Sequence, residues 1–183
     1  MKQFKLIVLG GGAEGIKFIQ GNAKFLSNTE IQVNEKIYKA NKFVVATGSS
    51  TFIPLIEGID RVDYLTNIEA LHLKELPHSM IILGSGPLGI EFAQMFSRFG
   101  TKVYLLQKRE RIIPRVEPEL AALLQRYLED EGIEIWTKAE IKSIRGESRE
   151  KRVKTVVDGK EKTFKGEKLL IATGRRPHCS EEI

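Results

Sequence analysis

"MIILGSGPLGIEFAQMFSRFGTKVYLL", residues 80–106, carries the clearest structural pattern in this 183-residue chain. Its first apolar run predicts a buried strand, and Gly84, Gly86 and Gly89 then match the pattern G-x-G-x-x-G. Apolar residues at helical spacing predict a helix that stops at Gly100, and the last apolar run predicts a second strand. A strand, a glycine loop, a helix and a strand in this order are typical of a dinucleotide-binding fold.

The three glycines have separate roles if this loop holds a dinucleotide. Gly84 permits the tight turn after the strand, Gly86 lets a pyrophosphate approach the backbone, and Gly89 lets the helix pack against the strand. The helix N-terminus adds free N–H groups and the positive end of its dipole. A glycine-rich turn that binds no ligand is the alternative interpretation. The residues of the loop that we predict to bind the cofactor are Gly84, Ser85, Gly86, Pro87, Leu88 and Gly89.

The end of the second strand predicts which dinucleotide binds. An acidic residue at this position accepts hydrogen bonds from the ribose hydroxyls and favours NAD. This chain instead has Gln107, followed by Lys108, Arg109 and Arg111. A glutamine does not repel a 2′-phosphate, and the basic side chains can pair with it. We therefore expect NADP(H) to be favoured over NAD(H), and a charged surface turn is the alternative.

Beyond this turn, helix and strand signals alternate. Pro118 suits the first turn of a second helix, which Gly132 ends, and Asp158-Gly159 predicts a hairpin turn. We predict an α/β fold of the Rossmann type: a doubly wound parallel sheet with an antiparallel β-hairpin insertion. The expected apolar stripe of the helix is Leu120, Leu123, Leu124, Tyr127 and Leu128, and the further strands cover residues 133–136, 141–144, 153–157 and 168–174.

The first 50 residues hold a second glycine pattern in different surroundings. The loop Gly10–Gly15 follows an apolar run, but residues 16–26 do not predict a long helix behind it. Residues 51–60, with a proline and a glycine, look like a domain boundary, and Thr66 or Asn67 can cap a helix after it. The short strands expected before the boundary are residues 16–19, 30–33, 36–38 and 43–46.

Composition narrows the classes of function. Hydrophobic residues make up 42% of the chain, enough for a packed core, and no apolar run is long enough to span a membrane. The net charge of +5 comes from basic residues interleaved with acids, so we expect no nucleic-acid partner. The single cysteine, Cys179, excludes an internal disulfide and favours the cytoplasm. His72, His78 and His178 lack metal-ligand spacing, so we expect no metal site.

Several segments carry a family likeness when taken together. They are KFVVATGSS at residues 42–50, IPLIEGI at 53–59, GSGPLGIEF to EPEL at 84–120 and LLIATGRRP at 169–177. In this combination they resemble the pyridine nucleotide-disulfide oxidoreductases, flavoenzymes that include dihydrolipoamide dehydrogenase, glutathione reductase and mercuric reductase. The turn LLQKRERII, residues 105–113, is most similar to NADPH-dependent mercuric reductases.

This resemblance implies a domain organisation. In the family an FAD domain is interrupted by an NAD(P) domain, and two Ala-Thr-Gly segments mark the crossings. Here these segments are residues 46–48 and 172–174. We therefore expect residues 1–52 to be a small β-rich remnant of the FAD domain, residues 53–174 to be the NAD(P)-binding domain, and residues 175–183 to return toward the FAD domain.

The resemblance also implies that parts of the parent enzyme are missing. Gly10–Gly15 resembles the FAD pyrophosphate loop, yet the FAD helix, the ribose-binding acid and the redox-active cysteine pair of the family are absent. Cys179 alone cannot cycle to an internal disulfide. The sequence also stops before the later flavin motif and the dimerisation domain. We expect a fragment or an internally deleted form, and natural deletion, gene-model error and engineering stay open.

Such a chain has a limited expected function. We expect it to bind a nicotinamide dinucleotide, to retain no FAD, to have no catalytic residue of its own and to be inactive alone. Apolar surface that the missing parts would cover favours self-association. The alternative is a non-catalytic nucleotide-binding or interaction protein derived from such an enzyme.

The resemblance adds further candidate site residues. Glu91 matches a glutamate near the nicotinamide end in the family, and an ordinary helix-face acid is the alternative. Ile141 stands where family members pack an apolar side chain near the adenine, and a core strand residue is the alternative. Ala172, Thr173 and Gly174 complete the predicted cofactor site at the end of the last strand.

Overall fold

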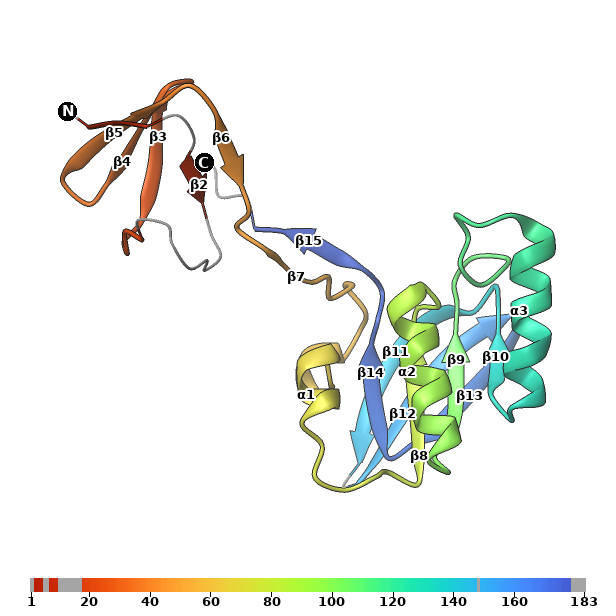
Figure 1. Cartoon of the computed structure of the whole chain (residues 1–183). Coiled ribbons are helices and arrows are strands. Elements are labelled where there is room, and N and C mark those ends of the chain that lie inside the picture. The colour runs from red at the N-terminus through yellow and green to blue at the C-terminus, as the bar shows by residue number, and fades with distance from the viewer. Residues whose placement is uncertain (1, 5–6, 10–17, 148, 179–183) are drawn as a thin grey trace. The chain divides into compact units, whose positions relative to one another are not determined.

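The computed structural model places most of the chain in two compact units (Figure 1). The smaller unit comprises Met1–Ser50 with Arg175–Ile183, and the larger unit comprises Thr51–Gly174. The residues that the structure describes are 2–4, 7–9, 18–147 and 149–178.

A four-stranded parallel sheet forms the centre of the larger unit. Its strands are β8 (Ser79–Leu83), β9 (Lys102–Leu106), β10 (Glu134–Trp136) and β14 (Lys168–Ile171). They lie in the order β10-β9-β8-β14, and every neighbouring pair is parallel. Numbered along the chain, this is the order 3-2-1-4 of dinucleotide-binding folds. The predicted α/β fold of the Rossmann type is therefore confirmed.

Two helices cover one face of this sheet (Figure 1). They are α2 (Pro87–Arg98) and α3 (Pro118–Asp130). Phe92 and Phe96 of α2 are buried in one cluster with Ile82 of β8. The apolar spacing that predicts the first helix thus follows its packing face, although Phe99 at its C-terminal end is 62% exposed.

The other face of the parallel sheet is covered by strands instead of helices. β11 (Glu140–Glu147), β12 (Glu150–Val157) and β13 (Lys160–Gly166) form an antiparallel sheet in the order β11-β12-β13. Ile81 of β8 packs in one cluster with Ile144, Val153 and Phe164 of these strands. Neighbouring residues of a strand point to opposite faces, so Ile81 packs against the antiparallel sheet and Ile82 packs against the helices.

The expected hairpin is part of this three-stranded sheet. Val157 pairs with Lys160, and the two residues between them, Asp158 and Gly159, have φ angles of 48° and 77°. Positive φ at both central residues is what the tight turn of a hairpin requires, which confirms the predicted turn. The third strand, β11, pairs with the free edge of β12 and so makes the insertion larger than predicted.

The predicted apolar stripe of α3 is wrong at three of its five positions. Leu120, Leu123 and Tyr127 are 57%, 38% and 59% exposed, whereas Leu128 is fully buried. Ala121 is also buried, so the packing face of α3 runs through residues 121, 124 and 128. The packing face of α3 is therefore rotated relative to the predicted stripe.

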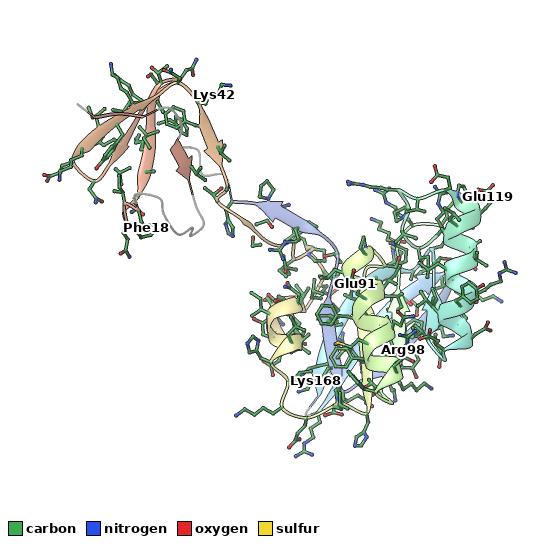
Figure 2. All side chains as sticks on the ribbon, in the orientation of Figure 1. Phe18, Lys42, Glu91, Arg98, Glu119 and Lys168 are labelled. Atoms are coloured by element: carbon green, nitrogen blue, oxygen red, sulfur yellow. The ribbon has the colours of Figure 1, made fainter. Side chains whose placement is uncertain are left out.

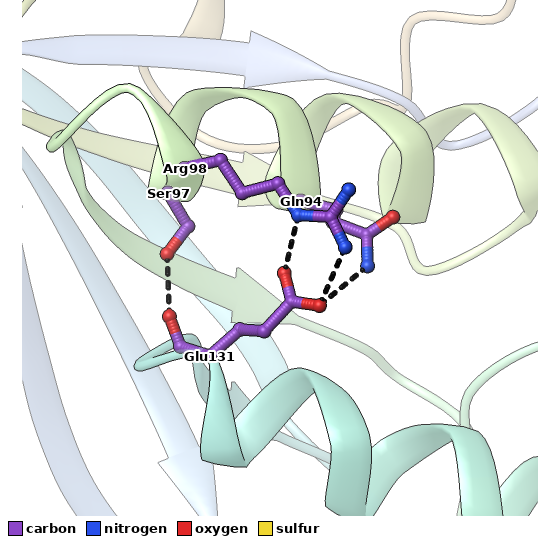
Figure 3. A network of polar contacts seen from close by, with 4 residues as sticks. All are labelled: Gln94, Ser97, Arg98 and Glu131. Carbon is purple, nitrogen blue, oxygen red and sulfur yellow. Dashed lines mark hydrogen bonds and ion pairs between the residues drawn. The ribbon is translucent and has the colours of Figure 1, made fainter.

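A polar network joins the C-terminal ends of α2 and α3 (Figure 3). Arg98 donates two hydrogen bonds to the Glu131 carboxylate, 2.9 Å from Nε to Oε2 and 2.7 Å from Nη2 to Oε1. Gln94 Nε2 donates to the same Oε1 at 2.9 Å, and Ser97 Oγ donates to Glu131 O at 2.9 Å. The Arg98 hydrogen bonds hold the pKa of Glu131 below its usual range. Arg98 is exposed and Glu131 is partly buried, so solvent screens the pair and limits its contribution to stability.

A short helix precedes the parallel sheet. α1 (Asn67–Leu71) begins at Thr66, whose Oγ1 accepts a hydrogen bond of 3.3 Å from Ile68 N. Glu69 Oε2 accepts one of 2.7 Å from Thr66 N, which completes a capping box. Of the two residues that could cap this helix by sequence, Thr66 is therefore the cap.

The smaller unit is built from short strands. β3 (Ala23–Ser27) and β4 (Glu30–Val33) pair antiparallel, as do β4 and β5 (Lys36–Ala40), and Ile31, Val33 and Tyr38 form their small core. The predicted strands at residues 30–33 and 36–38 are present, and the one at 43–46 is present over residues 43–45. Residues 18–19 are not in a strand, and the strand at residues 23–27 was not predicted. The strands are β1 (Lys2–Phe4), β2 (Ile7–Leu9), β3 (Ala23–Ser27), β4 (Glu30–Val33), β5 (Lys36–Ala40), β6 (Phe43–Val45), β7 (Ser49–Thr51) and β15 (Arg175–Pro177).

Within the described part of the chain, every helix is too short or too polar to cross a membrane.

Candidate dinucleotide-binding site

The parallel strands of the larger unit end at one edge of the sheet. Gly84 follows β8 there, Gln107 follows β9, and Ala172 follows β14. The strand order reverses between β8 and β14, because later strands lie on both sides of β8. In open α/β sheets, ligands bind at the carboxyl ends of the strands beside such a reversal. The glycine loop that follows β8 lies at this position.

Two glycines of the loop are required by close packing. Gly84 has a φ of 100°, and a Cβ atom there would lie 2.4 Å from Ala172 O. A Cβ atom at Gly89 would lie 2.0 Å from Gly84 O and 3.3 Å from the Ala172 Cβ. The start of α2 thus packs directly on the loop backbone, and the loop packs on the end of β14.

Gly86 has different surroundings from the other two glycines. A Cβ atom there would meet no atom within 4 Å, and its φ of −71° is open to any residue. Gly86 is the N-cap of α2 and makes no side-chain capping bond. The first intrahelical bond runs from Ile90 N to Gly86 O at 3.1 Å, so the N–H groups of Leu88 and Gly89 lie ahead of it. Gly86 and Leu88 are partly exposed at this helix start, whereas Gly89 is buried.

Ser85 and Gln107 bond to each other inside the protein. Gln107 Nε2 donates to Ser85 Oγ at 2.6 Å, and Arg109 N donates to Gln107 Oε1 at 3.2 Å. Ser85 is fully buried and Gln107 is 8% exposed. Ile113 N also donates to Ser85 O at 2.9 Å. These bonds fix the glycine loop against the turn that follows β9.

The turn after β9 lines a shallow basic hollow that is open to solvent. The hollow has a volume of about 430 Å³ and is lined by Lys108, Arg109, Glu110, Arg111 and Pro114. Arg111 Nη2 donates to Pro114 O at 3.2 Å, while Arg111 Nε is buried without a hydrogen-bond partner among the described residues. Three cations against one carboxylate make this hollow suited to an anion. Arg111, which the sequence places among the basic residues that can pair with a 2′-phosphate, lines this hollow with Lys108 and Arg109, and Glu110 and Pro114 were not predicted to do so.

The segment that ends β14 is tied to both sides. Ala172 N donates to Leu83 O at 2.8 Å, and Thr173 Oγ1 donates to Phe52 O at 2.6 Å. Phe52 N donates to Gly174 O at 2.9 Å. The structure thus brings Ala172 to the glycine loop, whereas Thr173 uses its hydroxyl for a contact within the chain.

The two remaining candidates lie in ordinary positions. Glu91 is exposed on α2 near the glycine loop (Figure 2). Ile141 packs partly buried against the cluster of Ile81, Ile144 and Phe164, as its alternative as a core residue predicts.

Two sequence predictions concern residues that the structure does not describe, and a third concerns metal binding. The first glycine loop, Gly10–Gly15, and Cys179 lie outside the residues that the structure describes. In the described ranges, no group of three or more histidine, cysteine, aspartate or glutamate side chains is placed to hold a metal ion.

The sequence profile of the pyridine nucleotide-disulphide oxidoreductases matches residues 4–182. The chain belongs to this family. Its members depend on FAD and NAD(P), and they bind nicotinamide dinucleotides. The predicted resemblance of the chain to this family is thereby confirmed.

Individual relatives are similar over most of this chain. A mercuric reductase from Bacillus cereus is 36% identical over 163 residues, which cover 89% of this chain and 26% of that protein. A dihydrolipoyl dehydrogenase from Acholeplasma laidlawii is 33% identical over 166 residues, covering 88% of this chain and 48% of that protein. The chain spans about a quarter to a half of the length of these curated relatives.

A solved structure shares the fold. The HOCl-induced flavoprotein disulfide reductase RclA from Escherichia coli superposes with a TM-score of 0.72 at 32% sequence identity. The match covers 88% of this chain and 37% of RclA.

Proposed function

We propose that this chain binds a nicotinamide dinucleotide with its pyrophosphate on the loop Gly84–Gly89. The observation that carries the proposal is the open backbone at Gly86, which lies beside the reversal of strand order and at the N-terminus of α2. Free N–H groups and the helix dipole favour a phosphate there. Pro87 lacks an N–H group, so Leu88 and Gly89 are the donors within the helix.

We further propose that NADPH binds more tightly than NADH. The support is the basic hollow after β9, where Lys108 and Arg109 are accessible to a 2′-phosphate. Gln107 is neutral and faces inward to Ser85, so it neither repels the phosphate nor competes for it. Charge-assisted hydrogen bonds of this kind contribute about 1.5–3 kcal/mol.

The proposed activity stops at binding. Hydride transfer from a nicotinamide needs an acceptor, which in this family is the flavin with a pair of cysteines behind it. The sequence has one cysteine, and we propose that the chain retains no FAD and turns over no substrate by itself. The domain division follows the same proposal, with residues 53–174 as the nucleotide domain and residues 1–52 and 175–183 as parts of an FAD domain.

A second candidate function is an interaction role. Val8 of β2 and Val44 of β6 pair in register, and with Val45 they are 45–48% exposed. Parallel strands are normally covered on both faces, so apolar residues exposed on such a pair favour association with another chain or a second copy. Sedimentation at rising concentration tests this role, and a monomer throughout contradicts it.

Calorimetric titration with NADPH and NADH tests the nucleotide proposal. Gly86→Ala and Gly86→Leu place a small and a large side chain in the space left for the pyrophosphate, and the Cβ atom of each meets no atom within 4 Å. We expect graded loss of binding with unchanged circular dichroism. Unchanged affinity in Gly86→Leu contradicts the proposed place of the pyrophosphate. Equal NADPH affinity after Lys108→Ala with Arg109→Ala contradicts the preference for NADPH.

A further inference from the structure

The turn that carries Lys108 is hydrogen-bonded to the segment before β11. Ala139 N donates to Gln107 O at 2.9 Å, and Lys138 N donates to Arg109 O at 2.9 Å. These two bonds hold residues 138–139 along the turn, on both sides of Lys108. β11 then begins with Glu140, so the backbone brings this carboxylate to the same turn.

Glu140 forms an ion pair with Lys142 and interacts electrostatically with Lys108. Its Oε1 lies 2.6 Å from Lys142 Nζ, in an ion pair that is about half exposed. The hydrogen bond and charge of Lys142, and then the charge of Lys108, lower the pKa of Glu140. The carboxylate is therefore negative at neutral pH and acts on Lys108 without lining the hollow itself.

We propose that Glu140 sets the strength of the coenzyme preference by opposing a 2′-phosphate at Lys108. This inference rests on the proposed nucleotide site. The carboxylate partly neutralises Lys108 and repels a second anion, so it weakens the binding of NADPH. NADH carries a hydroxyl at the same position and is little affected. Lys142 limits the effect because it pairs with the same carboxylate.

The expected change in NADPH affinity is small because Glu140 and Lys108 are exposed. Charges at a protein surface interact weakly, so removing the Glu140 charge tightens NADPH by about two- to fivefold. High salt reduces this difference, since surface charges are screened beyond about 8–10 Å at moderate ionic strength. A preference of NADPH over NADH that varies with Glu140 and with salt is the signature of the proposed role.

The test compares the dissociation constants of NADPH, NADH and their fragments 2′,5′-ADP and 5′-ADP. In Glu140→Gln we expect tighter NADPH and 2′,5′-ADP, with NADH and 5′-ADP unchanged. In Lys142→Met we expect weaker NADPH, because the carboxylate loses its other partner. The double variant should remove the effect of Lys142→Met, since no charge is left for the lysine to offset.

Glu150→Gln is the matched control. Glu150 also pairs with a basic residue two positions along its strand, Arg152, at 2.7 Å, and it lies at the other end of the β11–β12 pair from Glu140. An unchanged NADPH preference in this control supports a local effect of Glu140. An equal gain in Glu150→Gln shows a general effect of net charge and overturns the inference.

The outcomes separate this inference from the proposed function. If the unaltered chain binds none of the four probes, the nucleotide site itself is contradicted. If it binds them and Glu140→Gln leaves the ratio of the NADPH and NADH constants unchanged, the site stands and the role of Glu140 is overturned.

Discussion

A Cβ atom on Gly89 would lie 2.0 Å from the carbonyl oxygen of Gly84. The helix that follows the glycine loop therefore begins in direct backbone contact with the loop's first residue. This contact directs the N-terminus of α2 toward the space in front of Gly86, where a Cβ would meet nothing within 4 Å. Two glycines serve the fold here, and one leaves room for a ligand.

This division predicts different effects of alanine at two glycines. Gly89→Ala forces the loop backbone apart, and we expect it to lower the free energy of unfolding by about 1–3 kcal/mol. Gly86→Ala adds a methyl group to open space, so we expect a change within about 0.5 kcal/mol. Urea unfolding followed by the fluorescence of Trp136, the only tryptophan, reports on the larger unit. Equal stability of the two variants would contradict the packing account.

The bond between Gln107 and Ser85 predicts coupled effects on stability. Gln107→Leu leaves the fully buried Ser85 hydroxyl without its donor, which costs about 1–3 kcal/mol. Ser85→Ala removes the other partner, and the double variant should cost less than the sum of the two single changes. A double-mutant cycle on the same unfolding assay measures this. Strict additivity would mean that the bond contributes nothing.

The capping box of α1 predicts a dependence of stability on pH. The hydrogen bond from the Thr66 side chain, followed by that from its backbone N–H, lowers the pKa of Glu69. A carboxylate with a lowered pKa in the folded state stabilises the fold above its unfolded pKa of about 4.3 and loses this effect as the pH falls through the folded value. We expect Glu69→Gln to be less stable than the unaltered chain at pH 7 and to match it in acid. The control is Glu75→Gln, which removes the charge of another exposed acid. A difference in stability between Glu69→Gln and the unaltered chain that stays constant down to pH 3 would contradict this prediction.

Removing the Thr66 side chain tests the same cap without a charge. Thr66→Ala loses the acceptor for Ile68 N, and caps of this kind contribute about 1 kcal/mol. Thr66→Ser keeps the oxygen and should keep most of the stability. Thermal unfolding distinguishes the two, and equal losses in both variants would argue against the capping role.

The proposed absence of turnover has its own assay. We expect no oxidation of NADPH with disulfides, lipoamide or Hg(II), even with added FAD, because the chain offers no cysteine pair to receive electrons from a flavin. The absorbance of the reduced nicotinamide follows the reaction. Turnover that Gly86→Leu abolishes would show that the chain is an enzyme in its own right. A flavin absorbance band that survives gel filtration would contradict the expected loss of FAD.

Some elements follow from local sequence, and others depend on packing. Strand β8, the loop, α2 and β9 are predictable because apolar period, glycines and helix stop agree over residues 80–106. The packing face of α3 is not, because Leu120 and Leu123 fit a helical stripe as well as Ala121 and Leu128 do. Which stripe is buried depends on how closely the helix approaches the sheet, and the sequence of the helix alone does not contain this.

Parts of the candidate site can likewise be predicted from the sequence, and others cannot. The glycine loop and the basic run at Lys108 are readable because residue type and spacing carry their chemistry. The inward turn of Gln107 depends on the buried Ser85 hydroxyl, which is 22 positions away in the sequence. The position of Glu140 directly after the segment bound to the Lys108 turn depends on two backbone hydrogen bonds, which no side-chain pattern predicts.

Nuclear magnetic resonance of the backbone amides during an NADPH titration tests the central claim most directly. If the pyrophosphate lies on the glycine loop, the amides of Gly86, Leu88 and Gly89 should show the largest shifts, with further shifts at Lys108 and Arg109 that NADH does not reproduce. Binding that leaves the amides of residues 84–89 unshifted would contradict the account, because the nucleotide would then occupy another part of the molecule.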